Sequence, residues 1–281
     1  TNVAPTNYPE DIYGIVAEKA CEYLRAEAGS NPFANQWLTF GVNRSASKRP
    51  TMTQPYGSTP HSARSYVNQW YLDKVRGGAN DPFEESNRFQ ATAYLSSKIW
   101  EAINHVVGKP REAMAWLQGT ARTLAKFDRP FYWVSPSGFP CNQAYQKWEQ
   151  KSIRTKIGDK VLRVKFREDI DKMSPKRQAQ GSSPNFVHSL DASCLHLTVN
   201  KCEQLGIKDF AMVHDSYGTH SVNCETMANQ IRHTLVEIFE QDQLAILKNN
   251  LEEANDLTLQ DLPCYGNFNI NDITNSKYIF S

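Results

Sequence analysis

This sequence of 281 residues lacks several features that mark common classes of protein. It has no run of about 18 apolar residues and no recognisable signal or transit peptide, so we expect no membrane insertion. Its six cysteines form no CxxC pair and no zinc-like spacing, so we expect reduced, mostly buried thiols, as in a cytosolic protein. The net charge of only +1 gives no overall indication of a nucleic-acid partner.

Two common catalytic patterns are also missing. There is no HExxH pattern of a zinc hydrolase and no GxSxG pattern of a serine hydrolase. Some His and Asp residues in the C-terminal third could still be interpreted as a metal site, although they lack the spacing of known ligand sets: His188, Asp191, His196, His214 and His220. A lone histidine is more often a satisfied polar residue, so hydrolase chemistry is not favoured.

The sequence does contain enough apolar material for a large core. Hydrophobic residues make up 40% of the chain and aromatic residues 11%. This length and composition allow one large domain or two modest ones. No internal repeat or low-complexity tract is present.

A carboxylate at a predicted hairpin tip is the first candidate site. Asp215 stands between a short apolar run, residues 210–213, and a second short run, residues 217–220. This pattern predicts a tight β-hairpin with Asp215 at its tip. A carboxylate held there could ligate Mg²⁺, which prefers a few carboxylate oxygens together with substrate phosphates. The alternative is that aspartate is simply a good turn residue.

A basic stripe is the second candidate site. Arg44, Lys48, Met52 and Tyr56 recur every four residues, which on a helix keeps their side chains on one broad face. Two cations on one face suit a triphosphate, and Tyr56 with Gly57 would lie where a base or sugar could approach the backbone. The alternative is a solvated basic face with Tyr56 as a core residue.

Charge is also concentrated between residues 151 and 180, where ten Lys and Arg residues accompany only four acidic ones. The apolar and basic residues alternate around Gly158-Asp159, which predicts a hairpin. A basic segment in a nearly neutral chain is typical of local contact with a phosphate backbone. The alternative is a solvated surface hairpin.

Several of these motifs together resemble the single-subunit DNA-directed RNA polymerases of T-odd bacteriophages and mitochondria. Arg44-x-x-x-Lys48-Arg49-x-x-Met52-x-x-x-Tyr56-Gly57 is similar to the second polymerase motif of that family, and residues 214–218 (HDSYG) are similar to the third. Residues 184–191 (PNFVHSLD), residues 11–17 (DIYGIVA) and the C-terminus align in the same order. The similarity spans essentially the whole chain.

The resemblance implies a role for each motif residue. Lys48 would contact the triphosphate with Arg44 in support, Tyr56 would close over the nucleotide and help to select ribose, and His188 would lie near the growing transcript. Asp215 would bind two catalytic Mg²⁺ ions. The implied catalytic residues are Lys48, Tyr56 and Asp215, and the implied nucleotide-binding residues are Arg44, Lys48, Arg49, Met52, Tyr56, Gly57 and His188.

At the position of the basic hairpin, relatives carry a hairpin that contacts promoter DNA in the major groove. The hairpin is expected to be shorter here, so we expect phosphate contact without sequence-specific recognition. The residues expected to contact DNA are Arg154, Lys156, Arg163 and Lys165.

One part of the family pattern has no equivalent in residues 1–281. The first polymerase motif carries another metal-binding aspartate, and Asp81, Asp128 and Asp159 lack its flanking sequence. Because two-metal chemistry needs more than one protein carboxylate, we expect catalysis only together with an upstream segment or a second polypeptide. That partner would carry the N-terminal domain, the thumb and the first motif. The polymerase would act on DNA template, RNA transcript and NTPs in the cytoplasm, which for a phage source is that of an infected host cell.

Two rival hypotheses are kept. A family A DNA polymerase shares the basic-stripe layout, but it typically has Glu after the hairpin aspartate, where this chain has Ser216. A non-catalytic nucleic-acid-binding subunit could retain the fold without activity. The retention of Arg44, Lys48, Tyr56 and Asp215 favours a catalytic role.

The expected fold is α+β, with a helical fingers subdomain over residues 1–187 and a palm subdomain over residues 188–281.

Within the second motif, Ser47 is the expected N-cap, which would place Pro50 in the first turn, and Pro55 should push Gln54 out of helical geometry. Residues 168–182 are expected to be mobile. Helices are expected over residues 8–28, 61–74, 89–107, 111–127, 183–205 and 225–247, and hairpins over 131–144 and 152–166.

Overall fold

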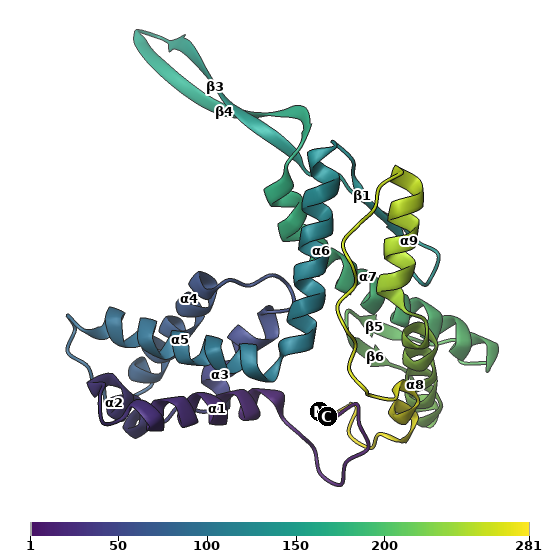
Figure 1. The fold of residues 1–281 in the computed structure, drawn as a ribbon, viewed down its shortest axis with the longest axis horizontal. Coiled ribbons are helices and arrows are strands. Elements are labelled where there is room, and N and C mark those ends of the chain that lie inside the picture. Colours follow the sequence, from purple (N-terminus) through teal and green to yellow (C-terminus); the bar gives the residue numbers. More distant parts are fainter. Residues whose placement is uncertain (1, 281) are drawn as a thin grey trace. The chain divides into compact units, whose positions relative to one another are not determined.

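The computed structural model describes residues 2–280 and divides them into two compact units. Unit 1 takes in the chain up to Met114, with Ala228–Glu240 and the stretch from Pro263 onward. Unit 2 consists of Ala115–Met227 and Gln241–Leu262. The fold is α+β, with helices and three separate two-stranded antiparallel sheets, which confirms the expected class (Figure 1).

Unit 1 is helical. Its helices are α1 (Ile12–Glu27), α2 (Pro32–Phe40), α3 (Arg44–Thr53), α4 (Pro60–Arg76), α5 (Arg88–Val106), the start of α6 (Gly108–Lys126), most of α8 (Cys224–Glu240) and the 3-10 helix η2 (Ile270–Asn275). The sequence sets several starts directly, because Asp11, Asn31 and Thr59 each accept a hydrogen bond from a backbone N–H of the first turn.

The core of unit 1 is formed by aromatic and aliphatic side chains from α1 to α5. Trp37 is fully buried; its indole N–H donates to the Ala91 carbonyl oxygen at 2.9 Å, and its ring centroid lies 4.6 Å from that of Phe83. Burial of a large aromatic side chain contributes a few kcal/mol, so this cluster fixes the packing of α3 on its neighbours. Other buried members are Val16, Leu24, Val67, Tyr71, Leu95, Ile99 and Ile103.

Unit 2 combines helices with the three hairpins. It holds the remainder of α6, β1 (Phe131–Val134), β2 (Pro140–Gln143), β3 (Gln146–Ile157), β4 (Lys160–Met173), α7 (Pro175–Gln204), β5 (Ala211–Val213), β6 (Ser216–Gly218), the 3-10 helix η1 (Ser221–Asn223), the start of α8 and α9 (Gln243–Asn255). Strands pair in sequence order, β1 with β2, β3 with β4 and β5 with β6. The core includes Trp116, Leu124, Phe131, Trp133, Phe186, Leu247 and Leu251.

Three expectations for residues 168–255 were wrong. Residues 168–173 continue β4, because Gln146 pairs with Met173, and α7 then begins at Pro175 after the Ser174 cap rather than at Pro184. Pro184 therefore lies inside a 30-residue helix. The single helix expected over 225–247 is interrupted, because Gln241 is extended and Asp242 caps α9 by accepting from the Ala245 N–H.

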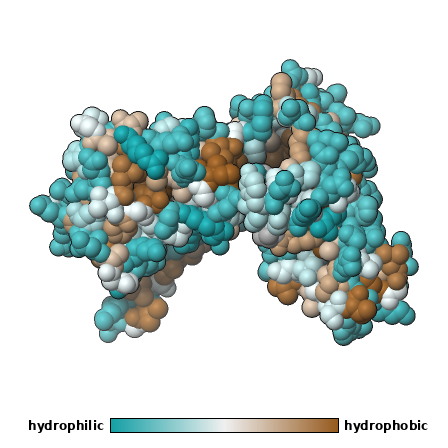
Figure 2. Space-filling view, turned by 90° about the horizontal axis from the view of Figure 1, so that it is seen from below, coloured by the Kyte–Doolittle hydropathy of each residue, from teal (hydrophilic) through white to brown (hydrophobic). Residues whose placement is uncertain are grey.

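The cysteines are free, as expected, but they are not mostly buried. Cys194 and Cys202 are buried, whereas Cys224 and Cys264 are exposed. On the face drawn in Figure 2, hydrophilic side chains predominate and apolar ones form separate patches. Within residues 2–280, no helix is long and apolar enough to cross a membrane.

Candidate nucleotide and nucleic-acid sites

Helix α3 begins earlier than expected. Asn43 is the N-cap and accepts from the Ser45 N–H, while the Ser47 hydroxyl donates to the Tyr13 carbonyl oxygen at 2.6 Å instead of capping a helix. Pro50 consequently lies in the helix interior, where a proline typically costs about 3 kcal/mol. Gln54 keeps α-helical backbone angles before Pro55, and Tyr56 lies beyond the helix as expected.

The predicted stripe on α3 is an exposed face. Lys48 is exposed, as are Met52 at 46% and Tyr56 at 39% of their full surface. The opposite face is buried and consists of Ala46, Ser47, Pro50, Thr51 and Gln54. The Lys48 ammonium has no hydrogen bond or ion pair with any residue between 2 and 280. A cation left uncompensated on a rigid helix face is well placed to meet an anionic ligand.

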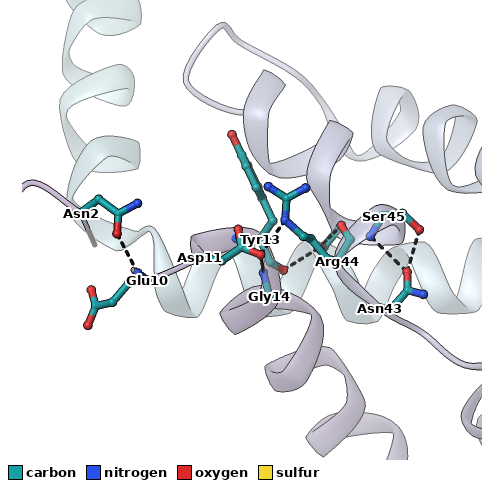
Figure 3. A network of polar contacts seen from close by, with 9 residues as sticks. Asn2, Glu10, Asp11, Tyr13, Gly14, Asn43, Arg44 and Ser45 are labelled. Atoms are coloured by element: carbon teal, nitrogen blue, oxygen red, sulfur yellow. Dashed lines mark hydrogen bonds and ion pairs between the residues drawn. The ribbon is translucent and has the colours of Figure 1, made fainter. Parts of the chain in front are cut away.

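Arg44 at the start of this stripe is held by α1 (Figure 3). Its Nε donates to Asp11 Oδ2 at 2.7 Å, and its Cζ lies 5.2 Å from the centre of the Tyr13 ring. Arg49 lies over the Tyr66 ring, with Cζ 4.3 Å from its centre. Such contacts order the guanidinium groups while leaving part of each accessible.

Gly57, directly after Tyr56, adopts φ +84°, a conformation that favours glycine. Its N–H donates to the Gln54 carbonyl oxygen at 3.0 Å, so the chain turns sharply at the end of the stripe. A side chain at position 57 would strain the turn that carries Tyr56.

The Asp215 hairpin in unit 2 has the predicted form. Val213 pairs with Ser216, which leaves His214 and Asp215 as the two residues of the turn. His214 adopts φ 54°, a left-handed conformation that histidine tolerates better than most residues. Asp215 is exposed at the tip, so its carboxylate oxygens are accessible to a ligand.

Helix α7 brings further polar groups to this hairpin. Partial desolvation raises the pKa of the Asp191 carboxyl, His188 opposes this shift, and the negative charge of Asp215 adds to it. Burial also raises the pKa of the Tyr217 hydroxyl, as does its hydrogen bond with the Cys194 thiol. These interactions place Asp191 and Cys194 of α7 near the two strands that carry Asp215.

His188 also borders a pocket within unit 2. The pocket has a volume of about 240 Å³, and its other lining residues are Trp133, Cys141, Asn142, Gln143, Tyr145 and Asn185. One wall is ordered by the Asn185 amide, which donates to Gln143 Oε1 at 2.7 Å and to the Tyr145 hydroxyl at 3.0 Å. His188 therefore lies beside a preformed polar hollow.

The β3–β4 ribbon has two chemically different faces. Arg154 pairs directly with Arg163, and residues opposite each other in an antiparallel ribbon share a face. One face therefore carries Arg154, Lys156, Arg163, Lys165 and Arg167, including all four residues expected to contact DNA. The other face carries five exposed apolar side chains together with Lys151 and Lys160; the apolar residues are Ile153, Ile157, Leu162, Val164 and Phe166.

Two groups of predicted site residues are thus assembled separately. Unit 1 holds the α3 stripe, and unit 2 holds His188, Asp215 and the basic ribbon. That Lys48 and Asp215 face one common cleft stays a prediction. The sequence did not predict that Asp11 contacts Arg44. The local signal at Asp11 is that of an aspartate at the start of a helix, which indicates an N-cap and not a contact with another helix.

Comparison with known proteins identifies the family of this chain. Residues 1–256 match the family described as DNA-dependent RNA polymerase. The chain belongs to that family, and the resemblance to single-subunit phage and mitochondrial polymerases is confirmed.

Similar proteins include T7 RNA polymerase of Escherichia phage T7, which is 32% identical over 329 aligned residues, covering 100% of this chain and 37% of that protein. The DNA-directed RNA polymerase of Enterobacteria phage T3 is 30% identical, with 100% and 37% coverage. The mitochondrial DNA-directed RNA polymerase 1B of Nicotiana tabacum is 29% identical, with 100% and 28% coverage. The chain thus spans little more than a third of the phage relatives.

Proposed function

We propose that this chain supplies the nucleotide-binding helix and the metal-binding hairpin of a DNA-directed RNA polymerase. The observation that carries the proposal is the exposed α3 stripe, in which Lys48 has no hydrogen-bond or ion-pair partner among residues 2–280. Lys48 and Arg44 bind the triphosphate, with Arg49, Met52 and Gly57 completing the nucleotide surface. Tyr56 closes over the nucleotide and discriminates ribose from deoxyribose, and His188 lies near the transcript end.

Asp215 is the proposed metal ligand of this chain. Its exposed carboxylate at the hairpin tip, with Asp191 close by, presents the hard oxygen donors that suit Mg²⁺. Within residues 2–280, no three His, Cys, Asp or Glu side chains are grouped as a complete metal site. When bound, two Mg²⁺ ions supply positive charge for the attacking hydroxyl and the leaving pyrophosphate.

The remaining polymerase parts come, on this proposal, from an upstream segment or a second polypeptide that contributes another carboxylate. The basic face of the ribbon contacts the phosphate backbone of the DNA template, using Arg154, Lys156, Arg163 and Lys165. The polymerase acts on NTPs and extends an RNA transcript, in the cytoplasm of an infected host cell where its source is a phage.

The direct test is extension of an RNA primer on a DNA template by the polymerase that contains this chain, with Mg²⁺ and NTPs. Asp215→Asn should lower the rate about 10²–10³-fold, as is typical when one electrostatic stabiliser of a transition state is removed. Asp209→Asn is the matched control, because Asp209 is an exposed aspartate just before the same hairpin. We expect the control to keep its activity.

An Asp215→Asn polymerase that extends the primer at the normal rate would remove the catalytic role of Asp215. Equal use of deoxyribonucleotides by the unmodified polymerase would favour the DNA polymerase hypothesis. A fully assembled polymerase that binds DNA but incorporates no nucleotide would favour a non-catalytic subunit.

A further inference from the structure

Arg44 forms a hydrogen bond through only one edge of its guanidinium group. Nε donates to Asp11 Oδ2 at 2.7 Å, and the plane lies near the Tyr13 ring. The two Nη atoms have no hydrogen-bond partner among residues 2–280, and Figure 3 shows them directed away from Asp11. The two Nη groups, which form the fork that suits a phosphate, are therefore available to a ligand, while Nε is fixed by Asp11.

Asp11 is itself fixed in place. As the N-cap of α1 it accepts from the Tyr13 N–H at 3.2 Å and from the Gly14 N–H at 3.1 Å. The Tyr13 carbonyl oxygen accepts from the Ser47 hydroxyl of α3 at 2.6 Å. A Cβ atom at Gly14 would lie only 3.1 Å from Asp11 Oδ2, so the backbone packs closely around the carboxylate. The beginnings of α1 and α3 are thus joined by a rigid polar contact.

We propose that Asp11 is a positioning residue that orients Arg44 for the nucleoside triphosphate. Because Asp11 binds Nε, both Nη groups of Arg44 remain available to a ligand. They lie about one helical turn from Lys48, which has no partner among residues 2–280. A triphosphate then meets an arginine whose side chain is already ordered. This inference rests on the proposed role of α3 as the triphosphate-binding helix.

Two opposing effects of Asp11 decide the expected result. Its negative charge repels a triphosphate, but in water and salt each phosphate charge several ångströms away contributes only about twofold in affinity. If the arginine side chain must first become ordered on binding, the affinity can be lowered by about 30-fold. Orientation should therefore outweigh repulsion, so that loss of Asp11 weakens nucleotide binding even though it removes a negative charge.

The experiment measures KM and kcat for NTP in the polymerase that contains this chain. Asp11→Asn keeps a good N-cap while removing the charge that holds Arg44. We expect KM to rise about 3–10-fold with little change in kcat, because binding common to the ground and transition states is lost. Glu18→Gln is the matched control, since it removes one exposed acid from the same helix; its KM should be unchanged.

A second measurement separates positioning from a structural role. In an Arg44→Ala background, Asp11→Asn should have no further effect on KM, because there is no guanidinium left to orient. A further rise in that background would overturn the proposal. So would an unchanged or lower KM in the single Asp11→Asn variant. If Arg44→Ala and Lys48→Ala also leave KM unchanged, the proposed role of α3 in binding the triphosphate is contradicted as well.

Discussion

At the scale of single residues, some partly buried carboxylates in this protein are held by several donors. Asp81 in unit 1 is the clearest case: it accepts hydrogen bonds from the Tyr71 hydroxyl, from the Phe83 N–H at 2.9 Å and from Arg88 Nε at 2.9 Å. Burial alone raises the pKa of the Asp81 carboxyl, but these donors outweigh it and lower the pKa below its ordinary 3.8. The ionised form is therefore stabilised by folding.

Asp81→Asn should destabilise unit 1 by about 2 kcal/mol at pH 7, as expected for loss of hydrogen bonds to a charged group. A carboxyl whose pKa is lowered on folding stabilises the protein above its ordinary pKa, and that stabilisation is lost as pH falls below about 4. The difference from the unmodified chain, measured by chemical denaturation, should therefore shrink at acidic pH. Asp73→Asn is the control, because Asp73 is exposed and its ion pair contributes little. Parallel stability curves across this pH range would contradict the account.

The sequence predicted single residues well where the signal was local. The four-residue spacing of Arg44, Lys48 and Met52 was enough to place them on one face of a helix. The contact between Asp11 and Arg44 could not be predicted in the same way, because it joins residues 33 positions apart through the packing of two helices. Only folding shows that the N-cap of one helix is also the counter-ion of another.

At the scale of elements, the β3–β4 ribbon shows how alternation along two paired strands produces two different faces. The strands are 12 and 14 residues long, and alternation places most of the cations on one face and most of the aliphatic side chains on the other. The turn at Gly158-Asp159 was predicted correctly, but the strands were predicted too short. The residues at the ends that were missed are mostly polar and exposed, so no burial alternation marked them as strand.

The double variant Arg154→Ala/Arg163→Ala should weaken binding to duplex DNA and reduce the slope of log affinity against log salt concentration by about 2. Lys151→Ala/Lys160→Ala is the matched control, because it removes the same charge from the opposite face of the ribbon. Fluorescence anisotropy over a salt series gives both slopes. Equal loss in the two double variants would show that only total charge matters.

At the scale of the whole molecule, the polymerase motifs are divided between two separate apolar cores. The α3 stripe belongs to unit 1 and the Asp215 hairpin to unit 2. Unit 1 is assembled from three stretches of the chain, and no change in composition marks their ends. The fingers and palm boundary at residues 187 and 188 stays a prediction, and it falls within the continuous helix α7.

We expect this chain alone to be inactive in RNA primer extension and to become active when mixed with a polypeptide that carries the other polymerase parts. The physical reason is that two-metal chemistry requires carboxylates beyond Asp215. Ribonucleotide incorporation by the chain, by its proposed partner and by the mixture checks this expectation. A mixture made with the Asp215→Asn chain should be inactive. Extension by the chain alone would show that no partner is needed.

The two-residue turn of the ribbon has one further consequence. Because Ile157 pairs with Lys160 across Gly158-Asp159, the length of this turn sets which side chains of β4 accompany those of β3. Inserting or deleting one residue there would shift the pairing by one and mix cations with aliphatic groups on both sides. Exchange of a single lysine for an arginine leaves this register intact, whereas a change in the length of the loop does not.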